Sequence, residues 1–537
     1  MIGEVSSDAI PWMAVLVCAL FILKGVFAVL LHWFATRRFA RYELEVGDEL
    51  FRGFMRASWE TRSQLSTAEV TRLADTAMAN TNLGFILPLS QIPGNAVTFV
   101  AVLSVLVFSQ PLTALIAFVY LSAISLIMLL VISRRAKLAG THNREFSFRV
   151  ATIMTEMMDA LKEVTLRGKL DEVARVVSKS RSRATRARAN LSFLGVVPKY
   201  AFEAALIGGF LLIGGASFLI GGAAAAVASV TMFAATGFRM IPAMNAVQGA
   251  LLSASANEIS ARDVIRELRA ARSAAAAQRE LVAARDRGTL PEHPSLLELR
   301  DVSFRYPGSE HDVLHGLSLT VPFGSSLAVV GPSGAGKSTL IDILLGLSEP
   351  SGGEMTIDGL PLGEIMAQWR SRVGYVPQRV ALFDASIAQN VALSWEDDYE
   401  LDRVTDALER AHLGDLAQRG DGLLEPIGER GQAISGGQQQ RLGIARALYS
   451  DPLVMVMDEA TSALDTATEN RVTESMRELQ GHVTFITVAH RLATIKEYDQ
   501  VCYLDRGRIL GSGTFDEVVA QVPDFRLQAT LAGLVHE

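Results

Sequence analysis

Long runs of apolar residues fill the first half of the chain, and this uneven distribution restricts the possible folds more than any other feature. Five of these runs approach the roughly 20 residues that a helix needs to cross a bilayer. The sequence therefore predicts a helical membrane domain over residues 1–290, followed by a soluble domain over residues 296–537. The predicted spans are Ile10–Phe34, Ile86–Phe108, Leu112–Ile132, Val197–Leu219 and Ala223–Ile241.

Basic residues cluster beside these spans, and their placement predicts how the spans are oriented. Lys and Arg are enriched in cytoplasmic loops, so three clusters are expected on the cytoplasmic side: Arg37–Arg41, Arg134–Lys137 and Lys179–Arg188. The short links between spans then face outward. We expect a multi-pass protein of the inner (plasma) membrane, with the soluble domain in the cytoplasm.

Charge and cysteine content exclude some classes of protein. The net charge of -7 argues against a nucleic-acid-binding protein, which usually carries an excess of basic residues. The two cysteines, Cys18 and Cys502, are too few for a disulfide framework or a cysteine metal site.

Two long stretches between the spans have mixed charge and helical spacing, residues 36–83 and 133–194. They could be solvated loops. Loops of this length without secondary structure are uncommon in compact proteins, so we expect the spans to continue as helices into the cytoplasm.

The soluble half contains a glycine-rich segment between a short apolar strand, Ser326–Val330, and an apolar helix, Leu340–Leu347. A loop in this context presents backbone N–H groups to phosphate oxygens, a lysine to the terminal phosphates and a hydroxyl to Mg²⁺. The segment therefore predicts a nucleotide site. Its residues are Gly331, Pro332, Ser333, Gly334, Ala335, Gly336, Lys337, Ser338 and Thr339.

Two further segments add to this prediction. A second apolar strand, Leu453–Met457, leads into Asp458 and Glu459, which could hold the Mg²⁺ shell and polarise the attacking water. Alone, this pair could be ordinary surface acids at a strand end. Between the two strands, ISGGQQQR at Ile434–Arg441 places a serine and paired glycines at the start of a helix, which favours a second phosphate-binding element.

Together these motifs resemble the nucleotide-binding domain of ABC transporters over Leu296–Leu531. The resemblance implies that Tyr306 stacks on adenine and that Gln378 contacts Mg²⁺ and the attacking water. It also implies that Glu459 is the catalytic carboxylate and that His490 contacts the γ-phosphate. SALD at Ser462–Asp465 resembles the D-loop, and IGERG at Ile427–Gly431 resembles a short cross-talk loop. The signature motif is matched by Ser435, Gly436, Gly437 and Gln438.

The same resemblance implies ATP and Mg²⁺ as cofactors, with Glu459, His490 and Gln378 in catalysis and Ser338, Gln378 and Asp458 at the metal. In this family ATP is held between the phosphate loop of one subunit and the signature motif of another. A second copy or a close paralogue is therefore expected, and a homodimer would have two competent sites.

The order of membrane half before ATPase half resembles ABC exporters, whose half-transporters have six spans where about five are visible here. The first visible span resembles the second family span, so the chain lacks the first or its true start lies upstream. Three segments, Lys162–Lys169, Val197–Glu203 and Phe238–Asn245, resemble bacterial flippases for lipid-linked oligosaccharides. A multidrug or lipid exporter of the same fold is an alternative. A non-transport ATPase that regulates membrane machinery is an alternative of another class.

Charged residues within or near the spans leave two interpretations open. Glu203 could pair with Arg239, and Lys24 and Arg239 could extend to the membrane interface. Alternatively, Arg239 and Lys199 could attract an anionic headgroup of the cargo, because intramembrane charges usually face a bundle interior or a water-filled cavity.

Overall fold

The computed structural model describes residues 9–64, 69, 72–285, 288–396, 398–418, 421–428, 431–460, 473–474, 476–489 and 492–535. Its contacts divide the chain into two units. The first comprises Met1–Ala57 and Gln64–Ala276, and the second comprises Ser58–Ser63 and Ala277–Glu537.

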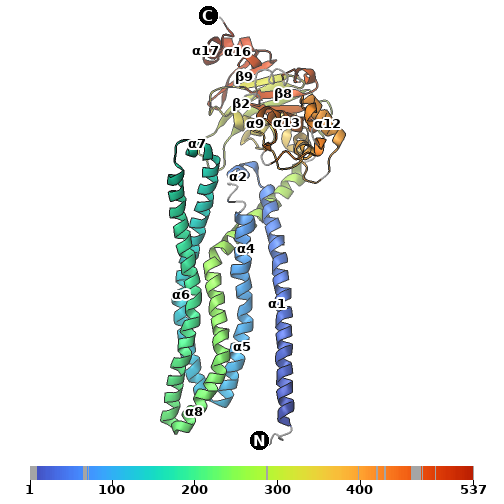
Figure 1. Ribbon diagram of the computed structural model, residues 1–537. Coiled ribbons are helices and arrows are strands. Elements are labelled where there is room, and N and C mark those ends of the chain that lie inside the picture. The colour runs from blue at the N-terminus through green and yellow to red at the C-terminus, as the bar shows by residue number, and fades with distance from the viewer. Residues whose placement is uncertain are drawn as a thin grey trace. The chain divides into compact units, whose positions relative to one another are not determined.

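The first unit consists of long helices joined by short connections (Figure 1). Pro111 begins α6 directly after α5, because proline suits the first turn of a helix and cannot extend a preceding one. Two short π-helical segments, η1 and η2, flank α4. The elements are α1 (Ala9–Met55), α2 (Trp59–Gln64, mostly assigned to the second unit), η1 (Arg72–Ala77), α4 (Met78–Thr81), η2 (Asn82–Ile86), α5 (Leu87–Ser109), α6 (Pro111–Asp159), α7 (Leu161–Leu166) and α8 (Leu170–Arg285).

The predicted spans all lie within these helices. In the described residues, three helical segments are long and apolar enough to cross a membrane: Asp75–Ser109, Pro111–Asp159 and Leu170–Ala274. The last contains two predicted spans, because α8 consists of two helices joined at Gly222. The φ of Gly222 is 72°, in the left-handed region that glycine tolerates. The remaining span, Ile10–Phe34, lies within α1. The chain therefore has the membrane-spanning character that its composition predicts.

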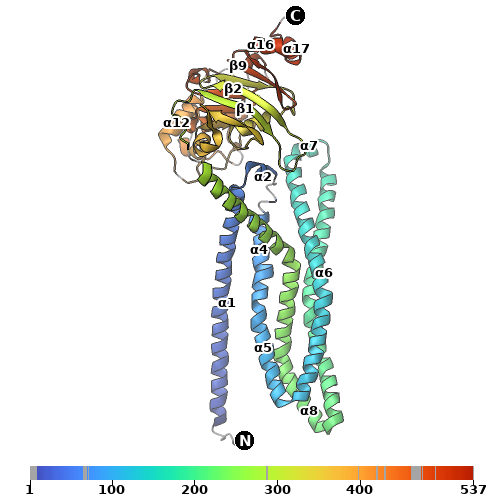
Figure 2. The ribbon, with the colours of Figure 1, turned by 180° about the vertical axis from the view of Figure 1, so that it is seen from behind.

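The helices extend well past the apolar runs, so the described parts of the two intervening stretches are largely helical, as expected. Figures 1 and 2 both show α6 and the first half of α8 running side by side to the short helix α7. From Ser125 onward, α6 also contacts the second half of α8 through a series of polar pairs, which we call the polar seam. Its pairs are Gln248 with Ser125, Ser133 with Ser255, Lys137 with Glu258, and Arg144 with Asp263.

The second unit contains two sheets. A four-stranded antiparallel sheet has the order β2-β1-β4-β5, and a six-stranded sheet has the order β10-β9-β3-β8-β7-β6. In the larger sheet only β10 pairs antiparallel with its neighbour. The strands are β1 (Leu296–Phe304), β2 (Leu314–Pro322), β3 (Ser326–Val330), β4 (Gly352–Ile357), β5 (Leu360–Pro361), β6 (Val373–Val376), β7 (Val454–Asp458), β8 (Thr484–Val488), β9 (Gln500–Asp505) and β10 (Arg508–Gly513).

Helices flank these sheets and complete the core. Strands β3 and β8 are buried along their whole length, which explains their continuous apolar sequence. The helices are α9 (Lys337–Leu344), α10 (Met366–Ser371), α11 (Ile387–Ala392), α12 (Leu401–Arg410), α13 (Gly436–Tyr449), α15 (Leu492–Ile495), α16 (Phe515–Gln521) and α17 (Pro523–Leu531), with short 3₁₀ turns at Leu362–Glu364, Gly414–Gln418 and Gly422–Leu424.

The polar seam depends on a close approach at Gly140, which generates a prediction. A Cβ atom at Gly140 would lie 2.1 Å from the carbonyl oxygen of Ala256 on α8. Gly140→Ala should therefore force the helices apart and lower the thermal unfolding temperature of the purified protein, with an overpacking cost of about 1–3 kcal/mol.

Gly249→Ala is the matched control on α8, because no heavy atom lies within 4 Å of its Cβ position. That substitution should leave the unfolding temperature unchanged or raise it, since alanine favours helix more than glycine does. An unfolding temperature for Gly140→Ala equal to that of Gly249→Ala would contradict the close approach.

Candidate nucleotide site

The sheet order brings the phosphate loop and the acidic pair to one edge. Strand β3 pairs in parallel with β8, and β8 pairs in parallel with β7. Since the carboxyl ends of parallel strands lie at the same edge of a sheet, the loop after β3 and Asp458 at the end of β7 are neighbours. The two segments are far apart in sequence, and the backbone ladder joins them.

Two glycines shape the phosphate loop. Gly331 has a φ of 150°, and a Cβ there would lie 2.0 Å from the carbonyl oxygen of Leu504. Gly336 has a φ of 103° and precedes α9, which begins at Lys337, three residues earlier than the sequence suggested. The loop therefore ends directly at a helix N-terminus, where free N–H groups and the helix dipole favour phosphate.

Lys337 is buried against its own loop. Its Nζ donates to the carbonyl oxygens of Gly331, at 2.7 Å, and Pro332, at 3.0 Å. Burial lowers the pKa of Lys337, against the opposing effect of the Glu459 and Asp458 carboxylates. Phosphate oxygens are stronger acceptors for an ammonium group than carbonyl oxygens, so they would compete effectively for this side chain.

A cavity of about 290 Å³ opens between the loop and the acidic pair. Eight of the predicted site residues line it, and Val313 and Val488 complete the lining. The eight are Ser333, Gly334, Gly336, Lys337, Ser338, Thr339, Asp458 and Glu459. Predicted residues of the phosphate loop and both acids thus form one site.

Glu459 lies at the end of this cavity in a strained backbone conformation. Its φ of 51° is uncommon for a residue with a side chain, and such strain is frequent at functional positions. Gln378 donates from Nε2 to the Glu459 carboxylate over 2.6 Å. This hydrogen bond orients the carboxylate, and the sequence alone did not reveal it because the two residues belong to separate elements.

Tyr306 approaches the loop through its hydroxyl group. The hydroxyls of Tyr306 and Thr339 lie 3.1 Å apart, and the Tyr306 ring packs edge-on against Phe304. Tyr306 is therefore beside the cavity without lining it. Pro332 and Ala335 also belong to the loop but not to the cavity lining.

The signature segment begins α13, as its sequence suggested. Ser435 caps this helix: its hydroxyl accepts a hydrogen bond from the Gln438 backbone N–H, and its own N–H donates to the Gln438 side chain. Gly436 and Gly437 form the first turn. None of these four residues lines the cavity, so the chain presents two separate elements with phosphate-binding chemistry.

The oxygen donors at the cavity fit a magnesium ion. Mg²⁺ usually takes one or two protein oxygens, substrate phosphates and several waters. Ser338 and Asp458 line the cavity, and Gln378 reaches its edge through Glu459. Among the residues that the structure describes, three or more His, Cys, Asp or Glu side chains nowhere gather into a dedicated metal cage. The oxygen donors that line the cavity suit an ion that arrives with a nucleotide.

His490 and the segment Ser462–Asp465 lie outside the described residues, as do two positions of the predicted cross-talk loop, Glu429 and Arg430. Their assigned roles remain predictions.

Comparison with known proteins agrees with this geometry. Residues 314–462 match the family model described as "ABC transporter". The lipid A-core flippase of Cupriavidus pinatubonensis is 39% identical over 41% of this chain and 38% of its own length. The β-(1→2)glucan export ATP-binding/permease protein of Bradyrhizobium diazoefficiens is 41% identical over 45% of this chain and 40% of its own. The match therefore spans about two fifths of these curated relatives.

Similarity of fold extends much further than similarity of sequence. A bacterial Atm1-family ABC exporter, solved with ATP bound, superposes with a TM-score of 0.79 over 100% of this chain and 93% of its own, at 23% identity. Residues 314–462 are thus an ABC transporter domain, a class that binds ATP. The whole chain has the fold of an ABC exporter half-transporter.

Proposed function

We propose that this protein is an ATP-hydrolysing ABC exporter or flippase subunit, which moves an amphipathic or lipid-linked substrate out of the cytoplasmic leaflet. The observation that carries the proposal is the cavity lined by residues of the phosphate loop, by Asp458 and by Glu459. Gln378 orients the Glu459 carboxylate at this cavity, and the chain has the exporter fold. A silent nucleotide-binding relative would not need an intact catalytic carboxylate.

Different residues of the chain bind the nucleotide, hold the metal ion and accept the proton. Lys337 would exchange its carbonyl partners for β- and γ-phosphate oxygens. Ser338 and Asp458 would hold Mg²⁺, which would neutralise charge on the phosphates. Glu459 accepts a proton from the attacking water, and Gln378 fixes the direction in which that carboxylate points. His490, which lies outside the described residues, is expected to contact the γ-phosphate.

The signature residues Ser435–Gln438 complete the site of a second subunit. None of these residues lines the chain's own cavity, and they begin a helix whose N-terminus suits phosphate. Both observations support a role at the nucleotide of a partner. We infer a dimer, with a second copy as the simplest partner, in the inner membrane. Closure of the two ATP-binding domains then switches the spans between two states, as rigid-body transitions do elsewhere.

The names of the relatives support a lipid- or glycan-bearing cargo, since they include a lipid A-core flippase, a glucan exporter and a sophorolipid transporter of Starmerella bombicola, the last 38% identical over 44% of this chain. Lys199 and Arg239 are exposed side chains within the predicted spans, and their charge suits an anionic headgroup. A lipid-linked oligosaccharide combines these properties.

Glu459→Gln tests hydrolysis. Glutamine keeps the shape of the side chain and an acceptor for Gln378 but cannot take a proton, so ATP should bind normally while turnover falls by about a hundredfold or more. Turnover is measured as phosphate release and binding with a fluorescent ATP analogue. Glu478→Gln, an exposed glutamate outside the cavity lining, is the control and should retain full turnover. Near-normal phosphate release from Glu459→Gln would refute the assignment.

Cargo class is tested by the ATPase rate of the full chain in lipid vesicles. Undecaprenyl-pyrophosphate-linked oligosaccharide should raise this rate, because cargo and nucleotide couple through the same two-state assembly. A panel of amphipathic drugs is the comparison. Stimulation by drugs alone would favour the multidrug alternative, and a rate indifferent to both classes would favour an ATPase that regulates other membrane machinery.

A further inference from the structure

The first half of α8 carries a one-sided charge. From Val173 to Phe202 the sequence contains seven basic residues and no Asp or Glu. Five of them, Lys179, Arg181, Arg183, Arg186 and Arg188, follow one another within three helical turns, and all five side chains are exposed. A stretch with this excess of positive charge repels itself unless anions lie nearby.

Several other basic residues of the same unit pair with acids. In the polar seam and around it, Lys137 pairs with Glu258 at 2.8 Å, and Arg272 pairs with Glu49 at 2.7 Å. Within the described residues, by contrast, none of the ion pairs involves Arg181, Arg186 or Arg188. Acids of the unit therefore neutralise cations such as Lys137 and Arg272, whereas Arg181, Arg186 and Arg188 are exposed and belong to none of these ion pairs.

Helix geometry places Arg186 and Arg188 next to a membrane surface. Arg188 precedes the Gly222 break by 34 residues, which is about 51 Å of helix at about 1.5 Å per residue. A bilayer with its headgroups is about 40–45 Å thick. If Gly222 marks one membrane surface, both arginines lie within about one Debye length, roughly 10 Å, of the opposite headgroups.

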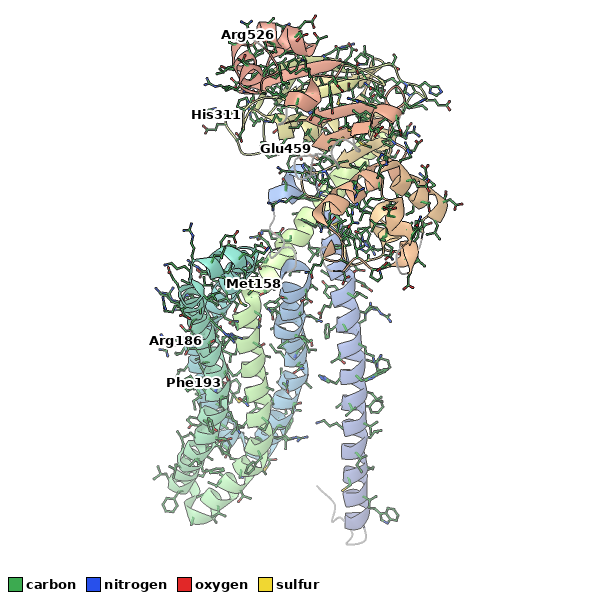
Figure 3. All side chains as sticks on the ribbon, turned by 45° about the horizontal axis from the view of Figure 1, so that its top comes forward. Met158, Arg186, Phe193, His311, Glu459 and Arg526 are labelled. Atoms are coloured by element: carbon green, nitrogen blue, oxygen red, sulfur yellow. The ribbon has the colours of Figure 1, made fainter. Side chains whose placement is uncertain are left out.

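Packing turns this charge away from the bundle. The buried residues Ala184, Ala187 and Leu194 form the face of α8 that packs inward. Phe193, seven residues after Arg186 and so on the same side of the helix, is 69% exposed. Figure 3 shows Arg186 and Phe193 together on the outer side of the helices. Phe193 precedes Gly222 by 29 residues, about 44 Å of helix, so its exposed apolar ring lies near the headgroup level.

The neighbouring helix adds charge at the headgroup level. Ile132 and Ala136 of α6 pack in one cluster with Leu194 of α8. Between them in sequence, Arg134 and Arg135 have exposed side chains and belong to none of the ion pairs in the described residues of this unit. Arg186 and Arg188 precede Leu194 by eight and six residues, which is about 12 and 9 Å of helix. Two adjacent helices thus present cations at neighbouring heights. We call these residues the interface patch: Arg134, Arg135, Arg186, Arg188 and Phe193.

We propose that the interface patch binds anionic phospholipid headgroups of the membrane surface from which α6 and α8 project. Arginine suits this partner, because its planar guanidinium group donates two hydrogen bonds to a phosphate. Juxtamembrane basic residues of this density attract anionic lipid over neutral lipid. The proposal concerns the surrounding lipid and does not depend on which cargo is moved.

The test compares lipids at the surface of the full chain in vesicles. Spin-labelled phosphatidylglycerol and phosphatidylcholine are each added, and electron paramagnetic resonance gives the motionally restricted fraction of each. In the wild type the restricted fraction of phosphatidylglycerol should exceed that of phosphatidylcholine several-fold. In the four-site variant Arg134→Gln, Arg135→Gln, Arg186→Gln, Arg188→Gln, this ratio should fall by about threefold or more. Added salt should weaken the preference of the wild type, because exposed charges are screened.

Two controls separate position from charge and from folding. Lys162→Gln with Arg167→Gln removes exposed cations near α7, about 25 Å or more farther along the helices, and should keep the preference. A four-site variant with Arg186→Lys and Arg188→Lys in place of the glutamines at these two positions should regain most of the preference for phosphatidylglycerol. An unchanged preference in the four-site variant, or an equal loss with the α7 substitutions, would overturn the proposal. If the four-site variant keeps its lipid preference and light scattering shows that it dissociates into monomers, the proposal is also overturned. That result would assign the patch to contact with a second copy of the chain.

Discussion

The hydrogen-bonded ladder that joins β3, β8 and β7 in parallel is the constraint on which the nucleotide site depends. It fixes the phosphate loop and the acidic pair at one sheet edge, although about half of the soluble domain separates them in sequence. Burial of β3 and β8 on both faces makes this frame rigid. A site that must place a carboxylate near a terminal phosphate needs such a frame, because small displacements of catalytic groups are costly.

Around this frame, local strain and hydrogen bonding prepare individual groups. Gly331 and Gly336 adopt conformations that side chains avoid, and Glu459 adopts one despite its side chain. Gln378 donates a hydrogen bond to the Glu459 carboxylate. Lys337 donates to carbonyl oxygens that a phosphate can replace. In the membrane unit, the Gly222 break and the close contact at Gly140 play comparable roles, since each allows a chain path that a larger residue would block.

Much of this could be predicted from the sequence, for a physical reason. Ser326–Val330 was predicted as a strand with its observed bounds, because a short apolar run before a glycine loop has few alternatives. The predicted spans Val197–Leu219 and Ala223–Ile241 leave a short link between them, and the break in α8 at Gly222 falls in that link. The Gln378–Glu459 hydrogen bond and the polar seam could not be predicted, since they join residues whose proximity arises only from tertiary packing. The π-helical segments beside α4 likewise leave no clear pattern in the sequence.

The central claim is that two chains share each ATP between the phosphate loop of one and the signature segment of the other. Coexpression of two defective chains tests it most directly. Lys337→Ala should disable every site in its own dimer, and Ser435→Ala should do the same from the other side. In the mixed dimer, one site receives both defects and the other receives neither. The account predicts that the coexpressed pair hydrolyses ATP while each variant alone does not. Activity absent from the mixture, with mixed dimers isolated and both chains folded, would contradict it.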